Sequence, residues 1–357
     1  MFWRRWSVIS ATNTEIEALA QTQGVIFLGA TTPEYPQAYE RFEGWIGEGR
    51  HGSMGFLENH ASLRQDPEKL LPGAQAVLSF ALPYYQPPEP KPRVALYAQY
   101  SDYHRVLRRK LESIAEALFA AESWRVLVDS APVLERALAA KTSEGFIGKN
   151  TLYIHPKHGS FLLLGEILTL QKWSADVPPE IPLDRKTRAG GCGPCRLCQT
   201  ACPTGALQKD YSLDARRCLS YWTIEHRGAI PEEFWPWLAE YYFGCDLCQL
   251  ACPYNKHAAS APVGWERRAF PDLFETATMD QARYESAFGG TPMTRAKREG
   301  LRRNALIALA VLEDKRLGQA LAHIDSDPSP VLQETREQIR RFKPALCAAS
   351  TQRQPTR

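Results

Sequence analysis

The stretch CGPCRLCQTACP, residues 192–203, decides how this chain is organised. Two, two and three residues separate its four cysteines, and a proline follows the fourth. A second stretch, GCDLCQLACP at residues 244–253, repeats the end of this pattern, and Cys218 lies alone between the two. Such spacing is typical of chains that hold two 4Fe–4S clusters, where the fourth cysteine of a run binds the other cluster. Eight of the nine cysteines are therefore predicted to be cluster ligands.

The crossing rule divides the eight cysteines into two groups. One cluster is predicted to be bound by Cys192, Cys195, Cys198 and Cys252. The other is predicted to be bound by Cys202, Cys218, Cys245 and Cys248. Cys218 departs from the plain pattern, because an insertion over residues 220–243, expected to be a loop or helix, separates it from its partners. The ninth cysteine, Cys347, is expected to be an ordinary free thiol.

Two other uses of cysteine compete with this interpretation. Structural zinc sites use paired C-x2-C spacings, and eight cysteines suffice for four disulfides. Zinc requires neither the three-residue spacing nor the proline after each fourth cysteine, Cys202 and Cys252. The opening MFWRRWSVIS has no apolar run long enough for an export signal, so disulfides are not expected. The pattern favours iron–sulfur clusters.

The composition is that of an ordinary soluble protein, with 44% hydrophobic and 23% charged residues. A chain of 357 residues is long enough for two or three domains. Nowhere does it contain about 18 consecutive apolar residues, so no membrane association is expected. We expect a cytoplasmic protein, because thiols stay reduced in that compartment. The net charge of +3 is too small to indicate a polyanionic partner by itself.

The first half of the chain mixes helix and strand patterns. The periodicity predicts helices over 14–21 and 103–121, and short strands over the four segments 25–28, 76–82, 126–128 and 161–168. Thr12 or Asn13 is able to cap the first helix. These elements predict an α/β-layer domain over residues 1–184, and an α+β class for the whole chain.

The remaining boundaries follow from composition. The proline-rich segment 177–182 and the polar segment 185–191 suggest a linker into a ferredoxin-like module over residues 185–257. Residues 258–272 are expected to be loop, and 295–312, 317–324 and 331–341 to be helices. We therefore expect an all-α, HEAT-like fragment over 258–349 and a disordered tail over 350–357.

Asp129 is the most informative acid, because it follows the apolar strand predicted over 126–128. A carboxyl at the end of a buried strand can have a raised pKa, which suits a proton donor. The alternative is a helix N-cap, which spacing alone favours. A glycine-rich G-x-G-x-x-G turn for a flavin or dinucleotide is absent from the sequence.

Basic residues concentrate between 295 and 303. Such a patch attracts phosphates, although a run of charge is more often a solvated helix face. The side chains in this window are Arg295, Lys297, Arg298, Arg302 and Arg303.

Several segments together resemble the epoxyqueuosine reductase family. They are DSAPVLER at 129–136, GKN at 148–150, Tyr97-Ala98, DYH at 102–104, the two cysteine runs, and the basic tail from 295 to 305. The resemblance covers nearly the whole chain in the expected order. It implies an oxidoreductase that reduces epoxyqueuosine to queuosine at the wobble position of tRNA, the last step in making this base.

The resemblance also implies cofactors and roles. Two 4Fe–4S clusters would feed electrons to a cobalamin bound without its lower base in the 1–184 domain. Asp129 would be the general acid that protonates the departing epoxide oxygen, so its catalytic role is preferred to the cap once the resemblance is included. The cobalamin contacts implied are Arg64, Tyr97, Tyr103, His104, Asp129, Ser220, Asp246 and Leu247.

Two of these residues have ordinary alternatives. Arg64 could pair with Asp66 or Glu68 at the surface, and His104 could be a satisfied histidine at a helix start. For the partners, the resemblance implies the anticodon loop of a tRNA with a GUN anticodon, an external low-potential electron donor, and a monomeric enzyme. The phosphate contacts expected are Arg295, Lys297, Arg298 and Arg303.

Three other functions remain open from the sequence. Another corrinoid and iron–sulfur reductase, such as a reductive dehalogenase, shares the order of modules but generally carries an export signal. A plain electron carrier with two 4Fe–4S clusters would leave Asp129 without a role. A structural zinc and RNA-binding protein would be colourless, whereas an iron–sulfur protein is brown.

Overall fold

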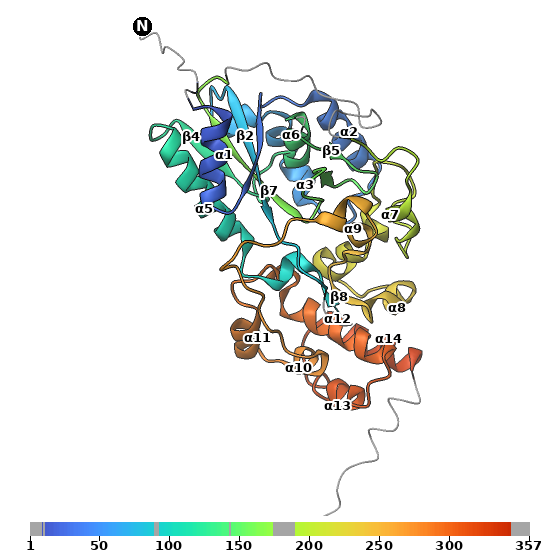
Figure 1. Ribbon diagram of the computed structural model, residues 1–357. Helices are drawn as coiled ribbons and strands as arrows, with labels where there is room; N and C mark the ends of the chain where they lie inside the picture. The colour runs from blue at the N-terminus through green and yellow to red at the C-terminus, as the bar shows by residue number, and fades with distance from the viewer. Residues whose placement is uncertain (1–8, 10, 89–92, 143, 174–189, 344–357) are drawn as a thin grey trace, which may run out of the picture.

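A four-stranded antiparallel sheet organises the first half of the molecule (Figure 1). The computed structural model describes residues 9, 11–88, 93–142, 144–173 and 190–343. The strand order is β1-β2-β7-β4, and every neighbouring pair is antiparallel. The strands are β1 (Ile26–Thr31), β2 (Ala76–Pro83), β4 (Trp124–Leu127) and β7 (Leu162–Thr169). An antiparallel sheet combined with separate helical regions confirms the α+β class.

Each face of the sheet has its own core, because side chains alternate along a strand. On one face Leu78 and Phe80 pack with Leu107 and Leu111 of α5 (Tyr103–Leu118), and α1 (Asn13–Thr22) joins the same core. On the other face, Val77 and its neighbours pack beneath α6 (Glu135–Lys141) and α2 (Pro36–Gly47). The end of β4 opens onto this second face, where the predicted acid lies.

Local sequence explains the ends of the first elements. Thr12 caps α1 in a reciprocal capping box with Glu15, as the sequence allowed. The strand predicted over 25–28 runs further, to Thr31, because Gly29 takes a φ of +121° and forms a bulge opposite β2. Only glycine takes that conformation without strain, so the strand continues past it.

The cysteine-rich segment forms a second layer beside the sheet. It contains α7 (Leu197–Thr200) and α9 (Leu247–Leu250), and the predicted insertion is a π-helical turn (Tyr221–Glu225), a short helix and a strand. The inserted strand β8 (Tyr241–Phe243) pairs in parallel with β3 (Arg93–Val94) of the first half. The buried amide of Gln249 donates to the Ser160 carbonyl at 2.9 Å and so ties α9 to the end of β7.

Short elements complete these two layers. They are α3 (Phe56–Asn59), α4 (Ala61–Gln65), η1 (Pro67–Leu70), η2 (Leu96–Gln99), β5 (Phe146–Ile147), β6 (Tyr153–Ile154), η3 (Ala215–Arg217), η5 (Glu232–Phe234), α8 (Trp235–Leu238) and η6 (Pro253–His257).

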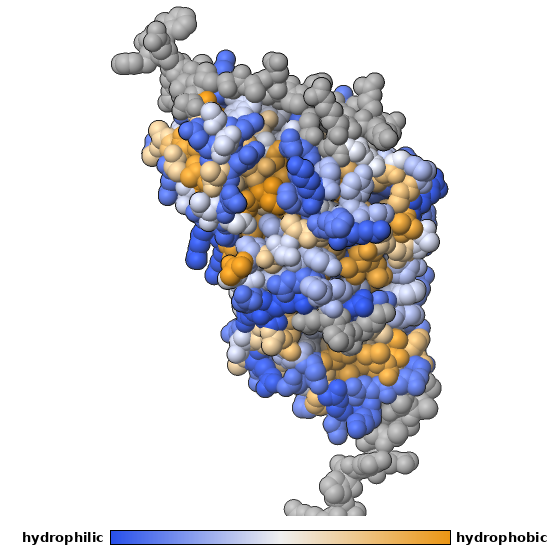
Figure 2. Space-filling view, in the orientation of Figure 1, coloured by the Kyte–Doolittle hydropathy of each residue, from blue (hydrophilic) through white to orange (hydrophobic). Residues whose placement is uncertain are grey.

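The C-terminal part is helical, as predicted, with more helices than the sequence indicated. The helices are α10 (Leu273–Thr278), α11 (Gln281–Phe288), η7 (Pro292–Ala296), α12 (Lys297–Val311), α13 (Leu317–Ala322) and α14 (Pro330–Phe342). The first two were missed because they are short, six and eight residues. Capping by Asp272 and Asp280 starts both helices. On the face that Figure 2 shows, hydrophilic side chains gather at the outer end of this helical part, with an apolar area beside them.

The central helix α12 is buried on every side from Gly300 to Ala310. Arg303, predicted to contact RNA, is only 1% exposed, so its side chain is not available to a phosphate. Its guanidinium instead donates to the carbonyl oxygens of Trp222, His226 and Gly228, which belong to the inserted segment. The prediction for Arg303 is therefore wrong, because a buried helix places this charge against orphan carbonyls.

Some predictions lie outside the described residues. They concern most of the linker over 177–191, Cys347 and the tail over 350–357. Within the residues that are described, none of the helices combines the length and the apolarity needed to cross a bilayer.

We predict that Arg303→Ala destabilises the protein by about 3 kcal/mol, because three buried carbonyls lose a charged donor. Urea unfolding, followed by tryptophan fluorescence, measures this change. Lys297→Ala, at an exposed position on the same helix, should shift stability by no more than about 0.5 kcal/mol. Equal stability of the two variants would contradict the structural role of Arg303.

Candidate active site and cluster ligands

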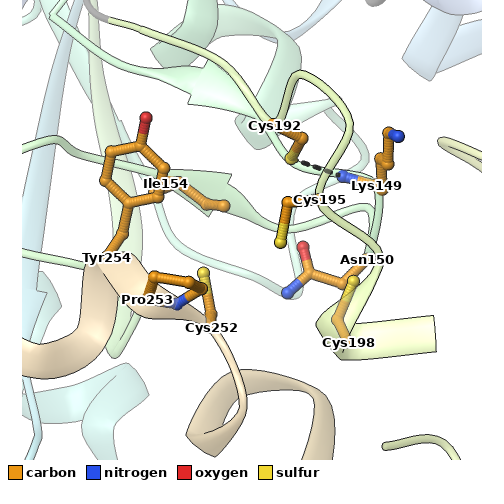
Figure 3. Close-up of a pocket in the computed structure, with 9 residues that line it drawn as sticks. All are labelled: Lys149, Asn150, Ile154, Cys192, Cys195, Cys198, Cys252, Pro253 and Tyr254. Carbon is orange, nitrogen blue, oxygen red and sulfur yellow. Dashed lines mark hydrogen bonds between the residues drawn. The ribbon is translucent and has the colours of Figure 1, made fainter. Parts of the chain in front are cut away.

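The first predicted cysteine group surrounds one cavity (Figure 3). Cys192, Cys195 and Cys198 reach it from the first run, and Cys252 reaches it from the second. The backbone N–H of Lys149 donates to the Cys192 sulfur at 3.3 Å. All eight cysteines of the motif are free thiols, so the disulfide alternative does not describe this arrangement. Four thiols facing a common space fit the donor set of an iron–sulfur cube.

The second group gathers in a half-buried position. Burial raises the pKa of Cys248 well above its usual value, and the neighbouring Cys245, Cys218 and Cys202 raise it further. Thiols that influence each other in this way lie close together. The insertion between Cys218 and Cys245 therefore folds back and does not separate the ligands. Ser220, predicted to touch a corrinoid, lies beside Cys218, and its hydrogen bonds to that thiol oppose the burial that raises the Cys218 pKa.

Asp129 lies just past the end of β4, at the meeting point of three polar side chains. Its backbone takes the left-handed conformation with φ +42°, which turns its side chain out of the strand direction. Its Oδ2 accepts a hydrogen bond from the Tyr103 hydroxyl at 2.7 Å and lies 2.8 Å from His104 Nε2. Asp102 caps α5 and lies 2.7 Å from the other ring nitrogen of His104. The carboxyl of Asp129 itself is 53% exposed, so a ligand can reach it.

The charge state of this centre differs from the sequence-based expectation. Crowding by the surrounding protein favours a neutral Asp129, but hydrogen bonds from His104 and Tyr103 outweigh it and lower the pKa of Asp129. Burial would lower the pKa of His104, yet its bonds to Asp129 and Asp102 raise it. Because both ring nitrogens face carboxylates, these contacts favour the doubly protonated imidazole. They shift the proton predicted on Asp129 toward His104, one hydrogen bond away.

Glu135 is a further carboxyl of the site that the sequence did not single out. It begins α6, and its carboxylate accepts a hydrogen bond from the Asp129 backbone N–H. Burial, reinforced by the charge of Asp129, raises the pKa of Glu135 to about 8. A carboxyl with this pKa is protonated at neutral pH, so a proton-bearing acid lies next to Asp129. Glu135 follows β4 by eight residues, and this spacing gave no signal that the two carboxyls meet.

A large cleft begins at these acids and extends to the cysteine-rich layer. It has a volume of about 1080 Å³, at the upper end of the usual range for ligand sites. Its walls come from α2, α3 and α6 and from residues 209–215, and they include Arg64, Asp129 and Glu135. The Arg64 guanidinium donates to the Leu57 carbonyl at 3.2 Å and lies over the Phe42 ring, instead of pairing with Asp66 or Glu68.

Three further predicted cofactor contacts are Tyr97, Asp246 and Leu247. Tyr97 packs edge-on against Tyr103, with ring centroids 6.1 Å apart. Burial raises the pKa of Tyr97, and the charges of Asp129 and Asp246 raise it further. It therefore joins the acid centre to the second cysteine run. Asp246 is 2% exposed and accepts from the Leu96 N–H at 2.8 Å, so its contacts are internal. Leu247 packs into the core of the helical part.

The basic window is divided between surface and interior. Lys297 is exposed, and Arg298 is half-buried beside Glu299. The Arg295 guanidinium binds the Glu225 carboxylate through two nitrogens, at 2.9 and 2.8 Å, and lies 4.9 Å from the ring centre of Phe56. Phe56 lines the large cleft, so Arg295 stands at its rim. Three of the four predicted contacts thus remain near the surface.

The comparisons with known proteins agree with this geometry. A family model described as "Epoxyqueuosine reductase QueG, DUF1730" matches residues 64–130, and one described as "4Fe-4S double cluster binding domain" matches residues 191–255. The second match shows an iron–sulfur protein. The epoxyqueuosine reductase of Pseudomonas aeruginosa is 37% identical over 299 residues, which cover 79% of this chain and 80% of that protein.

Solved structures show the same fold along nearly the whole chain. The epoxyqueuosine reductase of Streptococcus thermophilus superposes with a TM-score of 0.79 at 29% identity, covering 92% of this chain and 89% of that one. An epoxyqueuosine reductase with an epoxyqueuosine-modified tRNA-Tyr stem loop superposes with a TM-score of 0.80 at 27% identity, covering 96% and 94%. By sequence and by structure, the chain belongs to the epoxyqueuosine reductase family.

Proposed function

We propose that this protein reduces the epoxide of epoxyqueuosine in tRNA to the alkene of queuosine, with Asp129 and its partners as the proton source. The observation that carries the proposal is the hydrogen-bonded group of Asp129, Tyr103 and His104 at one end of a 1080 Å³ cleft whose other wall is the double-cluster segment. The predicted cluster segment, as the source of electrons, and the Asp129 group, as the source of protons, would thus serve the same cleft. The family relationship supports the same substrate.

Two kinds of cofactor suit the residues present. The two cysteine groups would hold the 4Fe–4S clusters, each through four thiolates. We propose that cobalamin occupies the large cleft, where the largely apolar walls and the Arg64 guanidinium suit a macrocycle with polar side arms. The chemistry that a corrinoid supplies is a low-potential cobalt centre. Of the predicted contacts, Arg64 and Asp129 line this cleft. Tyr103 and His104 would act on the cofactor through their hydrogen bonds to Asp129, and Tyr97, Ser220, Asp246 and Leu247 would support it from behind the cleft wall.

The reaction needs two protons as well as two electrons, because the epoxide oxygen leaves as water and an alkene remains. His104 would hold one proton in its hydrogen bond to Asp129, so Asp129 can relay this proton from the imidazolium to the epoxide oxygen, which leaves a neutral imidazole. Glu135, whose pKa is raised to about 8, holds another beside the same cleft. Tyr103 fixes the Asp129 carboxyl by donating to it. We infer that these groups together supply both protons.

The tRNA would be held near the rim of the cleft by basic side chains. Lys297, Arg298 and Arg295 are the candidates for phosphate contacts, and an unstacked base would enter the cleft. We further propose a monomeric cytoplasmic enzyme, an anticodon-loop substrate with a GUN anticodon, and an external low-potential electron donor. For the domains, we propose residues 1–184 for cofactor and substrate, 185–257 for the clusters and 258–349 for RNA.

Anaerobic incubation of the reconstituted protein with cobalamin, a strong reductant and tRNA carrying epoxyqueuosine tests the function. Nucleoside mass analysis should show the loss of one oxygen. Asp129→Asn should keep both clusters and tRNA binding but lower the rate by a factor of about 10² to 10⁴, since an amide cannot donate a proton as readily. No conversion by the wild type would refute the proposed reaction, and near-normal turnover of Asp129→Asn would remove the acid role.

The pH dependence of turnover should reveal Glu135. Because its acid form is present below its pKa of about 8, the rate should fall as the pH rises through about 8. Glu135→Gln should be slower and lack this decline, since glutamine still accepts the Asp129 N–H but does not titrate. Glu116→Gln is the control. It replaces an exposed carboxyl on α5 outside the walls of the cleft, and it should keep the decline. A similar decline in Glu135→Gln would contradict the assignment.

Salt dependence tests the RNA surface. Replacing both Lys297 and Arg298 with alanine should weaken tRNA binding and reduce the slope of log K against log salt by about 0.7 for each phosphate that the protein no longer neutralises. Lys315→Ala, an exposed lysine beyond the far end of α12, should leave the slope unchanged. Filter binding at several salt concentrations measures these slopes. Equal slopes for the double variant and the wild type would place the phosphate contacts elsewhere.

A further inference from the structure

The two cysteine runs contain a near-repeat whose copies face different surroundings. CRLCQTACP at 195–203 and CDLCQLACP at 245–253 match at seven of nine positions. The helices α7 and α9 begin at the equivalent leucines, Leu197 and Leu247, and both end at an alanine with φ −77° and ψ −11°. Because the two backbones are so alike, any difference in the exposure of equivalent side chains comes from what packs against each copy.

The second copy faces inward. Asp246 accepts a hydrogen bond from the Leu96 N–H, and Leu247 packs against the core that contains the helical part. Gln249 donates to the Ser160 carbonyl at the end of the sheet. All three side chains are therefore used to attach the cluster segment to the rest of the molecule, on the side where the acid centre lies.

The first copy faces solvent at the equivalent positions. Leu197 is 52% exposed, and Arg196 is exposed beside it. Few large apolar side chains in the described part of the chain are this exposed. Leu197 lies between the predicted ligands Cys195 and Cys198, so this exposed apolar side chain stands within three residues of two members of the first cysteine group. Single exposed apolar residues are common on protein surfaces, so it is the position of Leu197 between two predicted ligands that distinguishes it.

Exposed basic side chains stand on the segments of the first cysteine group. Arg196, Lys209 and Lys256 are exposed, and they belong to the segments that carry or flank the first cysteine group. Asp210, a carboxylate next to Lys209, lies 3.1 Å from the Lys149 ammonium, which offsets its charge. A basic rim around an apolar centre attracts an acidic protein and fixes its orientation.

We propose that Arg196 and Leu197, with the exposed Gly193, Pro194 and Thr200, form the docking surface for an acidic protein that carries a low-potential one-electron centre. The proposal rests on the proposed function only in requiring an electron supply. At each encounter the carrier loses one electron and the cluster segment gains one, so two encounters serve each epoxide. The inward copy passes electrons within the molecule, and the outward copy receives them.

Binding and electron transfer with a reduced acidic flavodoxin test this surface. Leu197→Glu and Arg196→Glu should each weaken binding to the carrier by about tenfold or more, because each places a negative charge against an acidic partner. Cluster reduction by flavodoxin should slow by a similar factor. Reduction by dithionite should be unchanged, which shows that the clusters are intact.

Leu312→Glu is the matched control, since Leu312 is similarly exposed, at 48%, but lies at the end of α12. It should bind and accept electrons as the wild type does. If Leu197→Glu loses its cluster, Leu197→Gln and Arg196→Ala replace it in the same assays. Unchanged binding in all Arg196 and Leu197 variants, or no binding of the wild type to acidic flavodoxin and ferredoxin, would overturn the proposal. Neither readout requires tRNA, so failure here is distinct from failure of the reductase reaction.

Discussion

The meeting of Cys252 with Cys192, Cys195 and Cys198 is the interaction on which the arrangement of the molecule depends. It requires the chain to leave the first run, build the inserted segment and return beside its start. The return places α9 against the end of β7 through Gln249. Everything after Cys252 then starts from a fixed point, so the helical part packs on the inserted segment and the cleft has two defined walls.

Buried polar groups make this arrangement specific. Arg303 and Asn304 both use their side chains to bind carbonyls of the inserted segment, and Asn304 reaches those of Thr223 and Tyr242. Apolar packing alone would tolerate sliding of α12, whereas these bonds have one satisfied register. Hydrogen bonds also fix the conformation of Asp129. Its unfavourable backbone conformation persists because Tyr103 and His104 bind its carboxyl and Glu135 binds its backbone N–H.

Features that depend on residue spacing could be predicted from the sequence, whereas features that depend on tertiary contacts could not. The sheet strands, the long helix α5 and the α+β class were confirmed, because periodicity and glycine positions are local signals. The charge state of the acid centre was not predictable, since the pKa of Asp129 depends on His104, which lies on another element. Arg303 shows the same limit. Its neighbours in sequence are basic, and its neighbours in space are carbonyl groups.

The burial of α12 also bears on how this protein can change over evolutionary time. One helix carries exposed cationic side chains in its first turn and a fully enclosed stretch from Gly300 to Ala310. Substitutions in the first turn leave the scaffold intact, and on the proposed phosphate contacts they change only the affinity for RNA. Substitutions a few residues later disturb the junction between the helical part and the inserted segment. The proposed RNA contacts are therefore free to drift among descendants of this sequence, while packing constrains the body of the same helix.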